Sequence, residues 1–366
     1  MPWIIDAHQD MAYNMLEFQR DYRRSVFDTR KIEKNTKVPD QNGETLLGWP
    51  EYQMGQIAVI FGTLYITPQH AAKGWEGQFW TNPHEARKLH LQQYHAYRDL
   101  CEDNPEMFRL ISSRSDFDEV LERWSSAPAE YPETTHPVGI ALSMEGAEGL
   151  PHLDDLVEWR DRGVRMVGPV WGGGRYCGAG FGGQEPHEFA TEGYDLLNVM
   201  AALGIALDVS HMNHHSLLQA IEAYPGDVVF ASHITCETVN GEHRERLITD
   251  EGIEHIIERD GVIGIVPANA FLRGNLPKKS RKEDVSLDDF AAHIDHVCQI
   301  AGNTRHVAFG TDFDGGFGLA SVPDGLNTIA DLQKMNSVLT NKGYNEDEIQ
   351  DIFGRNWQRI LENIFR

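Results

Sequence analysis

The chain has 366 residues of ordinary globular composition, 41% hydrophobic and 24% charged, with a formal net charge of −24. A chain this acidic would repel the phosphates of nucleic acids and anionic membranes, so we expect neither as a partner. No stretch approaches the ~18 uninterrupted apolar residues that indicate a transmembrane helix. The opening M-P-W-I-I-D has no basic leader, and we therefore expect a cytoplasmic protein. The four cysteines are far apart and lack metal-site spacing, so we expect free thiols in a reducing compartment.

Short runs rich in valine and isoleucine recur eight times along the chain. Near-continuous apolar runs are typical of strands that are buried on both faces of a parallel sheet. We therefore predict eight strands, at residues 3–8, 57–66, 138–145, 164–171, 205–211, 228–233, 262–269 and 307–312.

Segments with apolar residues at helical spacing lie between these runs. The predicted helices are at residues 83–100, 154–163, 194–204, 216–224, 250–261 and 287–302, with a helical tail from about 345 to 366. Strand and helix in alternation predict a single (β/α)₈ TIM-like barrel over residues 1–366. Two connections, 11–56 and 67–137, are much longer than the others, and we expect these loop excursions to form lids and substrate loops.

Metal-capable side chains stand at the ends of five predicted strands. In a barrel of this type the active site lies at the C-terminal ends of the strands. His8 and Asp10 are two residues apart, so in an extended segment they point to the same side. A single such residue is more often structural, but five strand ends together favour a metal site. The six candidates are His8, Asp10, Glu145, His211, His233 and Asp312.

Three histidines and up to three carboxylates are too many ligands for one tetrahedral zinc, and they suit a site with two ions. Glu145 is the natural carboxylate to bridge them. Two zinc-type ions ~3.5–4 Å apart lower the pKa of a shared water from ~15.7 towards ~7, so that it attacks as a hydroxide. Asp312 is then the general base or a further ligand.

These motifs resemble the membrane (renal) dipeptidase family, whose members are zinc metallopeptidases of the amidohydrolase superfamily. The resemblance runs in order along nearly the whole chain. It rests on H-Q-D at 8–10, M-E-G-A-E at 144–148, D-V-S-H at 208–211, A-S-H at 231–233 and G-T-D-F-D-G at 310–315.

The resemblance implies a role for each matching residue. His8, Asp10 and Glu145 would hold the first zinc. Glu145, His211 and His233 would hold the second. Asp312 would carry a proton from the bridging water to the leaving amine.

A further segment, R-E-R-L-I-T-D-E at 244–251, resembles the part of the family that carries an arginine for the terminal carboxylate of a dipeptide. The resemblance assigns this role to Arg246. A guanidinium fork fits a carboxylate bidentately. The alternative is an exposed arginine at the start of a helix.

One position departs from the family pattern. The family usually ends its fourth strand with a histidine that contacts the reacting carbonyl, and here Trp171 stands at that place. Tryptophan cannot act as an acid or base, although it can donate one N–H and stack. Arg175 and Tyr176, which follow closely, are candidates to replace the lost contact.

We therefore expect a hydrolase that binds two divalent ions, with Zn²⁺ as the expected metal, and that cleaves the amide bond of a dipeptide or a similar small amide. Two alternatives stay open: an amidohydrolase for an N-acyl amino acid or a lactone, and a catalytically silent barrel that binds a small molecule. The expected partner is a small-molecule substrate, and the oligomeric state stays open, a homodimer included.

Overall fold

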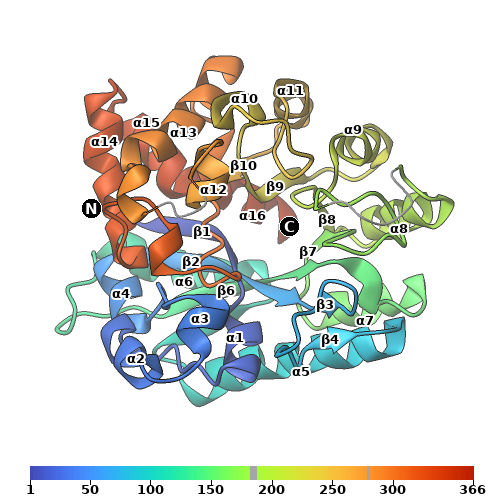
Figure 1. Ribbon diagram of the computed structural model, residues 1–366, viewed down its shortest axis with the longest axis horizontal. Coiled ribbons are helices and arrows are strands. Elements are labelled where there is room, and N and C mark those ends of the chain that lie inside the picture. The colour runs from blue at the N-terminus through green and yellow to red at the C-terminus, as the bar shows by residue number, and fades with distance from the viewer. Residues whose placement is uncertain (182–187, 278–280) are drawn as a thin grey trace.

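A computed structural model describes residues 1–181, 188–277 and 281–366 and has a nearly closed barrel at its centre (Figure 1). Eight parallel strands follow one another around the sheet in sequence order, which confirms the predicted barrel. Each of these strands overlaps one predicted run. They are β1 (Ile4–Gln9), β2 (Ile57–Tyr65), β6 (Val138–Glu145), β7 (Met166–Gly168), β8 (Ala206–Asp208), β9 (Val229–Ile234), β10 (Ile263–Ile265) and β11 (Val307–Phe309).

The first and last strands meet through polar contacts. Gln9 pairs with Phe313 in a parallel bridge, and the Asp312 N–H donates to the His8 carbonyl at 3.2 Å. The buried Asp6 carboxylate accepts the Thr311 N–H at 2.7 Å and the Thr311 hydroxyl at 2.6 Å. These contacts bring the ends of β1 and β11 together at the mouth of the barrel.

Burial explains why the strands read as continuous apolar runs. All residues of β1 and of β6 are buried. A further strand that the sequence analysis missed, β5 (Phe108–Ile111), pairs with the first half of β6 before β7 pairs with the second half. The two-residue strands β3 (Thr67–Pro68) and β4 (Phe79–Trp80) form a small separate sheet.

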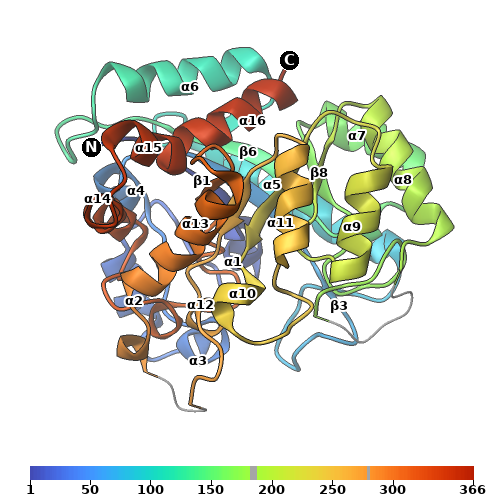
Figure 2. The ribbon, with the colours of Figure 1, turned by 90° about the horizontal axis from the view of Figure 1, so that it is seen from above.

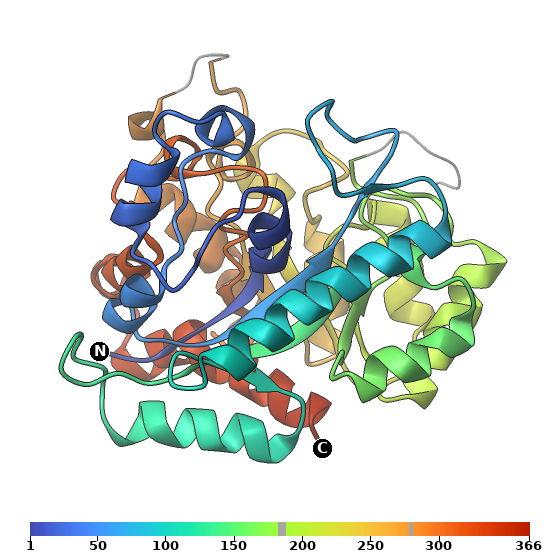
Figure 3. The same ribbon diagram turned by 90° about the horizontal axis from the view of Figure 1, so that it is seen from below.

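Helices surround the barrel, as Figures 2 and 3 show from opposite sides. The helices that overlap predicted ones are α5 (Pro83–Asp103), α7 (Leu156–Asp161), α8 (Thr191–Ala202), α9 (His214–Ala223), α11 (Asp250–Glu258) and α13 (Leu287–Ala301). The predicted helical tail consists of α15 (Glu346–Gln350), a π-helical turn (Asp351–Arg355) and α16 (Asn356–Ile364).

The long connections are folded segments. The first contains α1 (Met11–Glu17), α2 (Val26–Glu33), α3 (Val38–Asn42) and α4 (Trp49–Met54), and the second contains α6 (Arg114–Ser126). Helix α6 lies beside α16 in Figures 2 and 3. The Phe117 ring of α6 stacks with that of Phe365, the residue after α16, with centroids 6.4 Å apart. Three more short helices are α10 (Glu237–Asn240), α12 (Asn269–Leu272) and α14 (Met335–Asn341).

Local sequence sets the ends of the longer helices. Helix α5 starts where the Asn82 side chain accepts the N–H groups of His84 and Glu85, with Pro83 in the first turn. Helix α13 starts with a capping box of Ser286 and Asp289 and stops at Gly302, whose φ is 67°. No helix within the described residues has both the length and the apolarity that crossing a membrane requires.

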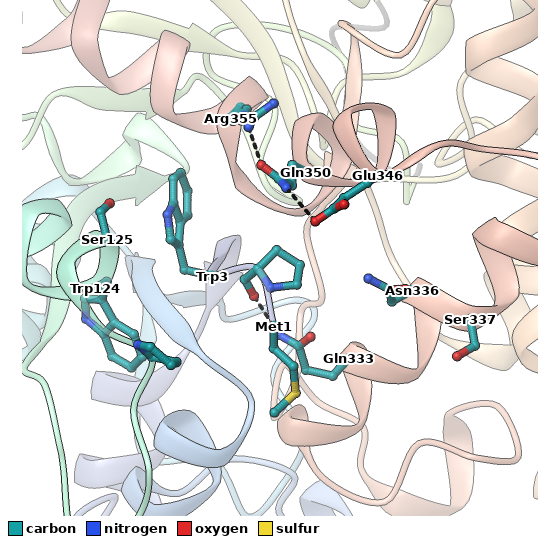
Figure 4. A pocket seen from close by; sticks show the side chains of 12 residues that line it. Met1, Trp3, Trp124, Ser125, Gln333, Asn336, Ser337, Glu346, Gln350 and Arg355 are labelled. Atoms are coloured by element: carbon teal, nitrogen blue, oxygen red, sulfur yellow. Dashed lines mark hydrogen bonds between the residues drawn. The ribbon is translucent and has the colours of Figure 1, made fainter.

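A cavity of about 740 Å³ lies at the N-terminal ends of the strands (Figure 4). Trp3, which directly precedes β1, and Trp124 form part of its wall. Its one arginine, Arg355, donates to Gln350 and lies 3.2 Å from Asp347, so its charge is already paired. Because barrel enzymes place their chemistry at the other end of the strands, we assign this cavity no catalytic role.

Candidate metal centre

The six predicted metal-capable residues converge at the C-terminal mouth of the barrel. A cavity of about 270 Å³ opens there, and Asp10, Glu145, His211 and Asp312 line it. His8 and His233 are almost completely buried and lie directly beside Glu145. Strands that are far apart in the sequence, and the residues that directly follow them, therefore deliver all six side chains to one place.

One group of donor atoms surrounds the imidazole of His8. Its Nε2 lies 3.7 Å from Asp10 Oδ1, 3.7 Å from Glu145 Oε2 and 3.8 Å from Asp312 Oδ1. His8 Nε2 and Asp10 Oδ1 are both buried, and neither has a hydrogen-bond partner within the described part of the chain. This group is suited to receive a cation.

A second group lies on the other side of Glu145. Glu145 Oε1 is 2.6 Å from His211 Nε2 and 3.3 Å from His233 Nε2, and these two nitrogens are 2.7 Å apart. Imidazole nitrogens and carboxylate oxygens are the ligands that zinc takes in proteins. One oxygen of Glu145 thus faces His8 and the other faces His211 and His233, as the oxygens of a bridging carboxylate would.

Arg246 is a buried part of the cavity wall, only 4% exposed. Its Nη2 donates to the His233 carbonyl at 2.9 Å and lies 3.3 Å from His211 Nε2. The guanidinium carbon is 5.7 Å from the Phe181 ring centroid and 5.5 Å from that of Phe271. The alternative of an exposed arginine at a helix start is therefore wrong.

Trp171 lies on the cavity wall, three residues after the end of β7, which stops at Gly168 and is shorter than the predicted strand. Its ring centroid is 5.1 Å from Tyr65, 5.7 Å from Phe181 and 6.1 Å from His211, and Tyr65 continues to Tyr13 at 5.3 Å. We call the four rings of Tyr13, Tyr65, Trp171 and Phe181 the aromatic wall. It covers one side of the cavity next to the candidate metal ligands.

The two candidates to replace the family's histidine are engaged elsewhere. Arg175 donates to Glu192 and to the Leu150 carbonyl, and its guanidinium carbon lies 4.8 Å from the ring centroid of Tyr176. Tyr176 is fully buried. Neither belongs to the residues that line the cavity in the described part of the chain, so this prediction is wrong.

A sequence profile of the membrane dipeptidase family, peptidase family M19, matches residues 2–365. The chain belongs to this family. It is therefore a hydrolase of the metallo-dipeptidase type, and its family implies that metal ions take part.

Individual relatives agree with this assignment. An uncharacterized protein of Klebsiella pneumoniae is 30% identical over 249 residues, which cover 66% of this chain and 88% of that protein. An uncharacterized dipeptidase of Schizosaccharomyces pombe is 24% identical over 369 residues, which cover 98% of this chain and 80% of that protein.

Solved structures share the fold. A metallo peptidase of Rhodobacter sphaeroides, with a bound phosphinate mimic of the dipeptide L-Ala-D-Ala, has a TM-score of 0.76 at 22% identity over 99% of each chain. A probable dipeptidase of Pseudomonas aeruginosa has a TM-score of 0.77 at 17% identity, over 100% of this chain and 96% of that one. At such low identities, the likeness establishes the fold alone.

In this M19 family member, residues behind the candidate ligands orient the imidazoles. Ser232 Oγ donates to the Asp208 carboxylate and lies 2.8 Å from His233 Nδ1. Because that hydroxyl proton goes to Asp208, the serine oxygen accepts the His233 Nδ1–H, which leaves a lone pair on Nε2. Asp208 also accepts the Ser210 hydroxyl at 2.6 Å. Sequence reasoning missed these roles, although D-V-S-H and A-S-H contain all three residues.

A buried turn holds Asp312 in place. Its backbone φ is 55° and that of Asp314 is 65°, a left-handed conformation that aspartate adopts more readily than most residues. Asp314 is tied to the first long connection, since its carboxylate accepts the Leu46 N–H at 2.8 Å and lies 3.0 Å from Arg20 Nη1. A Cβ added at Gly315 would lie 1.9 Å from Asp312 Oδ1, so the turn requires glycine there. Sequence reasoning also missed Asp314.

Burial and charge shift the titration of this M19 centre. Burial raises the pKa of Glu145 well above its usual value, and it raises the pKa of Asp312 to about 8. Burial alone would lower the pKa of His8, but the carboxylates of Glu145 and Asp10 raise it to about 10. Burial lowers the pKa values of His211 and His233, with Arg246 and His8 adding to the effect. The centre without ions therefore holds protons at neutral pH.

We expect metal binding to release protons from this centre. His8 is protonated below about pH 10 in the ion-free centre, and a ligand must give up its proton before it can coordinate. The apparent affinity for Zn²⁺ should therefore rise between pH 6.5 and 8.5, by about tenfold per pH unit for each proton released. Isothermal titration calorimetry in buffers of different ionisation enthalpy would count the protons. A binding heat that did not depend on the buffer would contradict this prediction.

Proposed function

We propose that this protein is a binuclear zinc-dependent dipeptidase, which hydrolyses the amide bond of a dipeptide or a similar small amide. The observation that carries the proposal is the position of Glu145. One of its oxygens faces His8, and the other faces His211 and His233. A carboxylate with His8 and Asp10 on one side and two histidines on the other suits two neighbouring ions.

The donor set fits two zinc ions. His8, Asp10 and Glu145 would hold the first, and Glu145, His211 and His233 the second. Two buried ligand atoms that have no hydrogen-bond partner among the described residues, His8 Nε2 and Asp10 Oδ1, support this assignment. Two overlapping triads support it as well, because the ligand atoms within each triad lie within 4.8 Å of one another. These triads are His8–Glu145–His233 and His8–Asp10–Asp312. When bound, such ions activate a water molecule and polarise the carbonyl of the substrate.

The protein's own residues orient the substrate and move the proton. Arg246 would bind the terminal carboxylate of the dipeptide, since its guanidinium lies on the cavity wall, near the Phe181 and Phe271 rings, and a guanidinium pairs with a carboxylate. Asp312 would take a proton from the attacking water and deliver it to the leaving amine. A carboxylate at the cavity wall can both accept and donate a proton, as this role requires.

The aromatic wall would exclude water and receive the substrate's side chains. Apolar surfaces in a cavity favour apolar side chains by about 25 cal/mol per Å² of surface buried. A related fold binds a phosphinate mimic of L-Ala-D-Ala, so we propose dipeptides of both L,L and L,D configuration as the first substrates to test.

We expect Trp171→His to increase dipeptide hydrolysis. Histidine at this position restores the family's usual side chain, which would contact the reacting carbonyl. One additional neutral hydrogen bond contributes about 0.5–1.5 kcal/mol, so kcat/KM should rise about 2- to 10-fold. A loss of activity in steady-state assays would instead mean that the contact of the Trp171 ring with the substrate contributes more than the restored hydrogen bond.

The proposal is tested by metal content and a substrate panel. Zinc-loaded protein should hold two ions per chain in the centre, and Glu145→Ala should lose both. Hydrolysis of L,L and L,D dipeptides is compared with hydrolysis of N-acyl amino acids and lactones. Faster cleavage of the second group would favour the alternative amidohydrolase. One ion or none, without hydrolysis of any substrate, would contradict the proposal and favour a silent barrel.

A further inference from the structure

We propose that His214, Glu237 and His243 form a second, separate metal site, which binds one Zn²⁺-like ion at the surface beside the barrel mouth. Three short segments bring these side chains together. His214 is the first residue of α9, Glu237 is the first of α10, and His243 follows α10 in the connection to α11. None of the three belongs to the centre built around Glu145.

The distances suit a tetrahedral ion. Glu237 Oε2 lies 2.9 Å from His243 Nδ1 and 3.4 Å from His214 Nε2, and one donor atom from each residue lies within 4.8 Å of the other two. Zinc–ligand distances of about 2.0–2.1 Å place neighbouring tetrahedral ligands about 3.3 Å apart. To complete the site, His214 would rotate its Nε2 away from the Leu247 carbonyl and towards the ion.

Glu245 supplies the support that a histidine ligand needs behind it. Its Oε2 accepts the His214 backbone N–H at 2.9 Å and lies 3.7 Å from His214 Nδ1. Without an ion, His214 Nε2 lies 2.8 Å from the Leu247 carbonyl, to which it donates. With an ion on Nε2, the neutral imidazole carries its proton on Nδ1. The rotation would have to shorten the 3.7 Å distance to Glu245 for that proton to be donated there, as in the carboxylate–histidine–zinc arrangement of many zinc sites.

The solvent exposure of the three side chains indicates how tightly the surface site would bind its ion. The His243 side chain is 72% exposed, while those of His214 and Glu237 are 17% and 20% exposed. Water would therefore supply the remaining ligand, and the ion would exchange with solvent. We expect weaker binding than in the buried centre, where the side chains of the candidate ligands are at most 13% exposed.

Occupancy of this surface site would also affect Arg246. His243, Glu245 and Arg246 lie in one short connection, whose far end is fixed because the Ile248 N–H donates to the Thr235 carbonyl at 2.9 Å. An ion on His243 would fix the near end and hold Arg246 in place. This consequence rests on the proposed function, whereas the ion site itself does not.

The test is a zinc count by equilibrium dialysis of the holoenzyme at increasing free Zn²⁺. Wild-type protein should take up one ion per chain more than His243→Ala or Glu237→Gln at high free zinc. The matched control is His215→Ala, which removes a neighbouring side chain that is 59% exposed and should keep the additional ion. Because His243 is so exposed, thermal unfolding of metal-free His243→Ala should match that of wild type.

Equal zinc counts in wild type and His243→Ala would overturn the surface site. The coupling to Arg246 has its own measurement, because added zinc should lower the KM for a dipeptide about fivefold in wild type and leave it unchanged in His243→Ala. An unchanged KM in wild type would overturn the coupling. If no dipeptide is cleaved, the proposed function fails, and the zinc counts still decide the surface site.

Discussion

Asp312→Asn is expected to lower kcat by about 10²- to 10⁴-fold while KM changes little, because it removes a proton acceptor that acts in the transition state. Asp312 lines the cavity, and its Oδ1 lies 3.8 Å from His8 Nε2. In the centre without ions, burial raises the pKa of its carboxyl group to about 8. Asparagine has nearly the same shape but cannot take up a proton.

Steady-state kinetics on the best dipeptide would measure this effect, with metal content determined on the same preparation. The asparagine variant should retain its zinc, which separates lost proton transfer from a lost ion. Since the general base acts when it is deprotonated, the wild-type rate should rise with pH as Asp312 ionises, and this rise should disappear in the variant. A kcat near the wild-type value would show that another group is the base.

The barrel and the cluster at its mouth could be predicted because both depend on local sequence patterns. Buried parallel strands read as apolar runs, and their C-terminal ends must meet at one rim. Glu145 is the last residue of β6, and His8 lies one residue before the end of β1. No knowledge of long-range packing is needed to expect these two side chains near each other.

The support behind the cluster could not be predicted in this way, because it depends on contacts between distant segments. Asp314 is held by Arg20 and by the Leu46 N–H, nearly 300 residues away in sequence. The burial of Arg246 depends on Phe181 and Phe271, which come from two other connections. Strand β5 could not be predicted from an apolar run either, because its sequence Phe-Arg-Leu-Ile is short and contains an arginine. Its two middle residues are only half-buried.

Arg246→Met is expected to reduce kcat/KM about 10- to 100-fold for a dipeptide with a free terminal carboxylate. A hydrogen bond to a charged group contributes about 1.5–3 kcal/mol, and the methionine side chain fills similar space without a donor. The loss should disappear for the same dipeptide with an amidated terminus, because neither enzyme can then form the charged contact. The two substrates together separate recognition of the carboxylate from general damage to the site.

General damage is a real alternative at this position, because Arg246 also donates to the His233 carbonyl and lies 3.3 Å from His211 Nε2. The zinc content of the variant therefore has to be measured on the same preparation as its kinetics. Arg244→Met is the matched control, since Arg244 lies two residues away, pairs with Glu242 and should tolerate the change. If Arg246→Met lost the same activity on free and amidated dipeptides, Arg246 would support the metal centre and would not bind the carboxylate. The preference for dipeptides would then have to come from the aromatic wall.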